Sequence, residues 1–117
     1  MKEISFEDIG GVVVTIRAEG AVAKGKVVGM ASKERVGVPA ANEGVCGVAL
    51  DVARDGVASV QVRGFATVAY SGSLQPGWVS LVANGSGGVQ KAGTGVTGHE
   101  FLLVSSDPQS RTAVILL

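Results

Sequence analysis

The segment from Gly44 to Val68 constrains the fold more than any other part of the sequence. It reads GVCGVALDVARDGVASVQVRGFATV, and apolar and polar side chains alternate on both sides of the pair Asp55-Gly56. Alternation with a period of two is typical of a strand with one buried face, and Asp-Gly suits the positive φ angles of a tight hairpin turn. The segment therefore predicts two antiparallel strands joined by a short turn, and it offers no catalytic group.

The composition extends this prediction to the whole chain. Of the 117 residues, 46% are apolar, 4% are aromatic and 18 are glycine. Valine, which dominates with alanine, fits a pleated sheet, and glycine marks turns and bulges. No segment shows a helical period, and Ser32 to Arg35 is expected to be a loop. The strand-like runs are Val12 to Arg17, Gly25 to Met30, Val45 to Val52, Val57 to Arg63, Phe65 to Tyr70, Trp78 to Ala83, Phe101 to Ser105 and Arg111 to Leu117. Their spacing predicts an all-β fold, a small barrel or sandwich with glycine-rich loops.

The length is that of one domain. We expect residues 11–117 to form a single β-barrel domain, and residues 1–10 to form an N-terminal arm or a first edge strand. Ile4, Phe6 and Ile9 are the apolar residues among the charges of this first segment. With so few aromatic residues the core is thin, so we expect part of the stability to come from association with other subunits or a partner.

Charge and cysteine usage exclude several functions. Ten basic and ten acidic residues give a net charge of zero, which argues against nucleic acid or an anionic membrane as a partner. The N-terminal sequence lacks the apolar core of a secretory signal, and no run approaches the roughly 18 apolar residues that span a bilayer. We therefore expect synthesis in the cytoplasm. Cys46 is the single cysteine, which excludes an internal disulfide.

Two glycine patterns resemble nucleotide-binding motifs but lack the required context. GAVAKGK, from Gly20 to Lys26, is followed by Val27 where a magnesium-binding Ser or Thr is needed, and GTGVTG spans Gly93 to Gly98. Both lead into strand-like runs, whereas the mechanism requires a helix whose N-terminal amides face the phosphates. We therefore expect no cofactor.

No spacing of residues predicts a catalytic or metal site. His99 is the only histidine and lies beside Glu100, but adjacent strand residues point to opposite faces. A triad of His99 with Ser105 or Ser106 would need an orienting acid and an oxyanion site, which no spacing supplies. The aspartates do not form a calcium-binding loop. We expect neither catalytic residues nor metal ligands, and hence a protein that is not an enzyme.

The stretch from Gly64 to Gln90 contains no charged residue but holds most of the aromatic ones. Interface cores are depleted of charge and enriched in aromatic side chains. The candidate subunit or capsid contacts in this stretch are Phe65, Tyr70, Leu74 and Trp78. The alternative is that these four side chains fill the core of the domain itself.

The order of glycines and valines along the chain carries a family resemblance. The relevant series is Gly25-Lys26-Val27-Val28, Gly37, Ala40-Ala41, Gly47-Val48-Ala49-Leu50, Gly56, Val60-Gln61-Val62 and Gly64. It resembles the small phage capsid decoration proteins, also called cement or head-stabilising proteins, over roughly Gly10 to Ala83. The resemblance implies a β-barrel or β-tulip-like domain that binds the outside of an icosahedral head, commonly as trimers between capsomers, and stabilises the expanded shell.

The same resemblance implies the partners and the location. The partners would be the major capsid protein and other copies of the chain, and the location would be the exterior of the virion. The N-terminal segment, with Ile4, Phe6 and Ile9, would be the candidate capsid-binding arm, although residues 1–10 do not have the Ser/Thr/Pro-rich composition of the long leader in lambda-like members.

Two other classes of function fit the sequence less well than a structural role. A β-barrel that binds a ligand such as a carbohydrate would use Trp78 or Tyr70 as a stacking platform, but polar side chains suited to a sugar are sparse. A small enzyme would need a nucleophile or an acid–base pair that no spacing supplies. We therefore expect a structural virion protein, with the ligand-binding barrel as the alternative.

Overall fold

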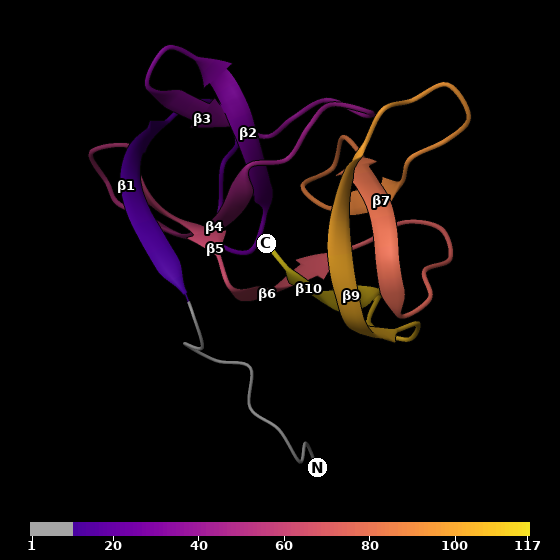
Figure 1. Ribbon diagram of the computed structural model, residues 1–117. Helices are drawn as coiled ribbons and strands as arrows, with labels where there is room; N and C mark the ends of the chain where they lie inside the picture. The colour runs from indigo at the N-terminus through magenta and orange to yellow at the C-terminus, as the bar shows by residue number, and fades with distance from the viewer. Residues whose placement is uncertain (1–10) are drawn as a thin grey trace.

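The computed structural model describes residues 11–117, which form ten strands and no helix (Figure 1). The all-β prediction is confirmed. In this part of the chain there is accordingly no apolar helix of membrane-spanning length. The strands are β1 (Val12–Ala18), β2 (Val27–Ser32), β3 (Arg35–Gly37), β4 (Gly47–Val52), β5 (Val57–Arg63), β6 (Phe65–Ala69), β7 (Gly77–Ala83), β8 (Val89–Lys91), β9 (His99–Asp107) and β10 (Thr112–Leu116).

The first five strands close into a barrel in the order β1-β3-β2-β4-β5, with β5 pairing back to β1. Only the pair β1 and β3 is parallel. A barrel of five strands encloses little space, so small side chains suffice to fill it. The buried residues inside it are Val28, Val36, Ala49, Ala58 and Val60.

The other five strands form a second sheet in the order β6-β10-β9-β7-β8. This sheet curls, because an isolated bridge pairs Tyr70, just after β6, with Val89 on the far edge strand, and the Ser71 N–H donates to the Val89 carbonyl at 2.9 Å. Its concave face encloses a second core. The buried residues of that core are Val27, Val48, Ala66, Val68, Tyr70, Leu74, Leu81, Val89, Phe101, Leu103, Ala113 and Ile115.

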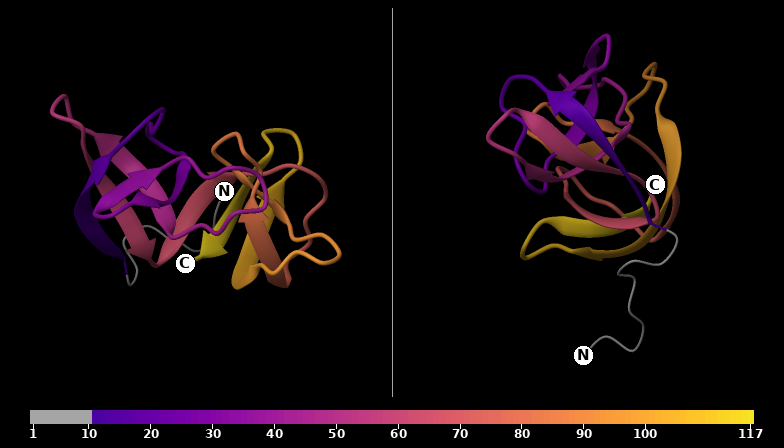
Figure 2. Two further views of the ribbon diagram at one scale, coloured as in Figure 1. Left: turned by 90° about the horizontal axis from the view of Figure 1, so that it is seen from above. Right: turned by 90° about the vertical axis from the view of Figure 1, so that its left-hand side faces the viewer.

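The barrel and the second sheet lie side by side and share a wall (Figure 2). On β2, Val27 belongs to the second core and Val28 to the barrel core, and on β4 Val48 and Ala49 divide in the same way. Successive strand residues point to opposite faces, so one pair of strands can supply both cores. Within residues 11–117 no polar or charged side chain is buried.

The hairpin of β4 and β5 is present, but its turn differs from the prediction. Gly56 has a φ of 85°, whereas Asp55 is not among the residues with positive φ. The Gly56 N–H donates to the Ala53 carbonyl at 2.9 Å, and the Asp55 carboxylate accepts the Val57 N–H at 3.1 Å. The connection is therefore a three-residue loop with one left-handed glycine, and Asp55 acts through its side chain.

The eight predicted runs correspond to eight strands, with ends displaced by two residues or fewer. The short strands β3 and β8 were not predicted. At Ser32 to Arg35 the chain forms neither a helix nor an open loop but reverses between β2 and β3, with Glu34 at a φ of 61°. In the glycine-rich span before β8, the Asn84 side chain accepts N–H groups from Ser86 and Gly88. Strands β3 and β8 contain three residues each, too few to show the alternation from which the other strands were predicted.

Gly47, at the start of β4, has no room for a side chain. An added Cβ would lie 2.5 Å from the Gln61 carbonyl oxygen and 2.7 Å from Cγ1 of Val60. We expect Gly47→Ala to lower the free energy of unfolding by about 1–3 kcal/mol, as other overpacked sites do. Gly93, where an added Cβ would meet nothing within 4 Å, is the matched control, and its change to alanine should cost less than about 0.5 kcal/mol. Urea unfolding measures both, and equal effects would contradict the prediction.

Candidate interaction surfaces

Four apolar side chains lie side by side across the second sheet. Phe65 is the cross-strand partner of Leu116, Leu116 of Leu102, and Leu102 of Trp78. The row thus crosses β6, β10, β9 and β7 in their spatial order. We call these four residues the apolar row.

The apolar row points away from the core of its own sheet. The adjacent residues Ala66, Ile115 and Leu103 are core residues, and the row therefore occupies the opposite, outer face. Trp78 is 68% exposed, and the other three members are half-buried. An exposed tryptophan at the end of a continuous apolar row marks a surface suited to a contact with another molecule.

The structure separates the four predicted contact residues into two pairs. Phe65 and Trp78 are on the apolar row, whereas Tyr70 and Leu74 are only 6% and 5% exposed and belong to the core. The Arg111 guanidinium further covers Tyr70, 5.1 Å from the centre of its ring. Tyr70 and Leu74 therefore fit the alternative expectation, that these side chains fill the core of the domain.

The sequence analysis missed Leu102 and Leu116, the two central members of the row. Both are on segments that were predicted as strands, so alternation indicates which residues share their face. That they lie beside Phe65 and Trp78 follows only from the order of strands in the sheet, which alternation does not reveal.

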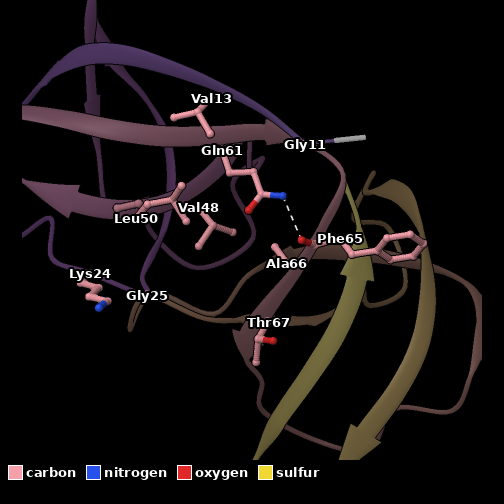
Figure 3. A pocket seen from close by; sticks show the side chains of 11 residues that line it. Gly11, Val13, Lys24, Gly25, Val48, Leu50, Gln61, Phe65, Ala66 and Thr67 are labelled. Carbon is pink, nitrogen blue, oxygen red and sulfur yellow. Dashed lines mark hydrogen bonds between the residues drawn. The ribbon is translucent and has the colours of Figure 1, made fainter. Parts of the chain in front are cut away.

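A groove lies between the barrel and the second sheet (Figure 3). It has a volume of about 670 Å³. Val13, Gln61 and Val48 are cross-strand neighbours on its barrel side, and Ala66 faces them from β6. Leu50 adds to the apolar lining. The remaining residues around the groove are Gly11, Lys24, Gly25, Ala49, Phe65 and Thr67.

The groove exists because the chain bends sharply between β5 and β6. Gly64 has a φ of 98°, and a Cβ there would lie 2.9 Å from the Gly11 Cα. Gln61 holds the bend, since its Nε2 donates to the carbonyls of Arg63 at 3.0 Å and Phe65 at 2.9 Å. The Phe65 ring points away from the groove, whereas its carbonyl faces Gln61 (Figure 3).

The residues considered for catalysis are not brought together. His99 is exposed at the start of β9, and its ring packs edge-on against Phe101 with 5.1 Å between centres. Ser105 and Ser106 lie on the same strand, which rises about 3.3 Å per residue, so roughly 20 Å separates them from His99. Among residues 11–117, no three His, Cys, Asp or Glu side chains cluster as they would around a metal ion.

Two titratable groups of residues 11–117 have shifted pKa values, and local structure accounts for both. Hydrogen bonds from the backbone of Gln109 and from the side chain and backbone of Ser110 lower the pKa of Asp107, the last residue of β9. Burial of the sulfur raises the pKa of the Cys46 thiol, against an opposing backbone hydrogen bond. The residue as a whole is nevertheless exposed. The arm residues Ile4, Phe6 and Ile9 lie outside the described residues.

The hydrogen bonds of Gln61 provide a test of the bend. We expect Gln61→Ala to lower the free energy of unfolding by about 1–2 kcal/mol, because two hydrogen bonds worth about 1 kcal/mol each are lost. Gln75 is exposed in a loop, and Gln75→Ala should change stability by less than about 0.5 kcal/mol. Chemical denaturation of both variants checks this, and an unchanged midpoint for Gln61→Ala would show that the bend holds without them.

A scan against protein-family models finds no matching family, and a search of curated proteins finds no matching protein. The function is therefore inferred from the apolar row, the groove and the residues around them.

Proposed function

We propose that the protein is a structural decoration protein that binds the outer surface of a tailed-phage capsid and stabilises the expanded head, as a trimer between capsomers. Its partners in this role are the major capsid protein and other copies of the chain. The observation that carries the proposal is the apolar row, with Trp78 exposed at one end.

The apolar row has the anatomy of an interface centre. Tryptophan is among the residues that contribute most to binding, and interface centres are apolar with a polar rim. Ser80 and Glu100, which pair with each other, lie two residues along β7 and β9 from Trp78 and Leu102, and so share their face. Thr67 likewise lies two residues from Phe65 along β6 and shares its face. These polar side chains supply a rim around the row.

A trimer supports the proposal through multivalency. A standard interface buries about 800 Å² on each partner, and a row of four side chains supplies only the centre of such an area. Three copies that bind together around a three-fold axis gain avidity, because the second and third contacts form at a high effective concentration. A row that is too small for tight binding of one chain to the shell can thus be sufficient for tight binding of a trimer.

The framework behind the row suits a protein whose role is to present a surface. Both cores are apolar, and no polar or charged side chain is buried within residues 11–117. His99 and the two serines of β9 are held apart on one strand, and the net charge is zero. These features favour a permanent apolar contact over a reaction or electrostatic steering.

The exposure of Trp78 also favours the alternative function, a carbohydrate-binding barrel. Tyr70, the other candidate platform, is in the core, so a sugar would stack on Trp78 alone. Trp78 is the only tryptophan, and its fluorescence therefore reports this site directly. Titration with oligosaccharides should leave the emission unchanged, and saturable quenching by a sugar would favour the alternative.

The capsid proposal is tested by comparing the effect on binding of substituting Trp78 with that of substituting a similarly exposed apolar side chain outside the row. Met30, on the barrel strand β2, is 61% exposed and serves as the matched control. Expanded shells of the phage that carries the gene should bind the chain stoichiometrically in co-sedimentation. Trp78→Ala should weaken that binding by about 30-fold, as expected for a side chain that contributes 2 kcal/mol, and Met30→Ala should leave it unchanged.

Analytical ultracentrifugation of the purified chain gives the oligomeric state. A trimer, alone or on the shell, agrees with the proposal, and so does a gene that neighbours those of a major coat protein and a portal. A stable monomer that leaves expanded shells bare would refute it.

A further inference from the structure

We propose that the groove between the barrel and the second sheet binds the N-terminal segment of the same chain, residues 1–10. The inference does not depend on the capsid role, because it concerns the free protein, in which this candidate capsid-binding arm contacts no capsid. Four features of the groove carry it.

The first feature is the position at which the described chain begins. Gly11 itself lines the groove, and its Cα lies against Gly64 at the bend. Ten residues reach at most about 36 Å when extended, whereas a strand of five residues such as β6 is about 17 Å long. The segment is therefore attached at the groove and is long enough to reach all of its lining.

The second feature is the apolar surface that the groove leaves bare. Val13 is 52% exposed and Leu50 is 39% exposed, and their side chains face the same space as Val48 and Ala66 (Figure 3). In residues 1–10 the apolar side chains are Met1, Ile4, Phe6 and Ile9. Packing these side chains against Val13 and Leu50 removes apolar surface of the segment and of the groove from water.

The third feature is charge. Among residues 11–117, Lys24 is the only charged side chain that lines the groove, and its ammonium group lies at one rim (Figure 3). The N-terminal segment carries one basic side chain, Lys2, against three acidic ones, Glu3, Glu7 and Asp8. The segment and the groove are therefore complementary in charge as well as in apolar surface.

The fourth feature is an open strand edge. Tyr70 donates its N–H to Arg111, and Leu117 donates its N–H to Gly64. In an antiparallel pair such bonds alternate along the strand, so the backbone groups of Thr67 point away from β10, toward the side where Gly25 lies (Figure 3). No hydrogen bond to these groups is formed from within residues 11–117. An extended segment in the groove can pair with Thr67 as an added strand does.

Because residues 1–10 are joined to Gly11, which lines the groove, the chain's own segment is favoured as the occupant over the segment of a second copy. A tethered segment reaches its site at an effective concentration in the millimolar range, so modest contacts are enough to fill the groove. Occupancy should then be independent of protein concentration.

A spin label tests both the site and the source of the segment. Cys46→Ser removes the native thiol, and Ser5→Cys in the full-length chain then places a label within residues 1–10. We expect severalfold loss of the amide signals of Val13, Leu50 and Thr67, with the signal of Met30 unchanged. A label at Lys33→Cys, in the turn between β2 and β3, is the matched control and should spare the groove.

A mixing experiment identifies which chain supplies the segment. Spin-labelled chains without isotope are added to isotope-labelled chains without the spin label, and we expect no signal loss. Signal loss in the mixture would assign the groove to a second copy and overturn the proposal. Unperturbed groove signals in the singly labelled chain would also overturn it.

Amide hydrogen exchange gives an independent measurement on the full-length protein. The Thr67 amide should exchange about tenfold faster in Phe6→Asp than in the unmodified chain, since loss of an apolar contact exposes the edge. The Val68 amide, which faces β10, is the internal control and should be unchanged. Equal Thr67 rates in both proteins would contradict the inference. Capsid occupancy by Phe6→Asp and Trp78→Ala is measured separately, so failure of one proposal does not imply failure of the other.

Discussion

The fold depends on two strands whose opposite faces are both buried. Val27 and Val48 face the core of the second sheet, and their neighbours Val28 and Ala49 face the barrel core. Because strand side chains alternate, each residue in this wall is committed to one core. A shift by one position would move every one of these side chains to the wrong core. The wall tolerates only small side chains, which explains why a chain so poor in aromatic residues can bury two cores.

The bend at Gly64 gives rise to both candidate surfaces. On one side it opens the groove, where Gln61 holds the two arms of the bend together. On the other side it directs Phe65 onto the outer face, beside Leu116. The apolar row and the groove therefore share one structural origin, and Phe65 belongs to both, with its ring on the outer face and its carbonyl toward Gln61 at the groove. The proposed contact with a capsid and the proposed packing of residues 1–10 can be tested separately.

Alternation and turn residues were sufficient to predict the all-β class and eight of the strands, because both are local properties of the chain. They could not predict which strands become neighbours. Leu102 and Leu116 were therefore missed, and the sequence left open whether Tyr70 and Leu74 lie at a surface or in the core, where the curled sheet encloses them. Short strands also escape prediction, as β8 shows, since it is defined by its pairing with β7. The groove depends on the path of the chain around Gly64, which no sequence pattern specifies.

The absence of buried polar side chains within residues 11–117 has a consequence for proton linkage. The two cores of this part hold no acidic or basic side chain, so its folding desolvates no group that is charged at neutral pH. The lowered pKa of Asp107 adds stability above the pKa of the unfolded chain, and this stability is lost as the pH falls through the folded value. That group is fully exposed, and its effect is confined to acid. The apolar row and the groove thus rest on two cores whose burial involves no acidic or basic side chain.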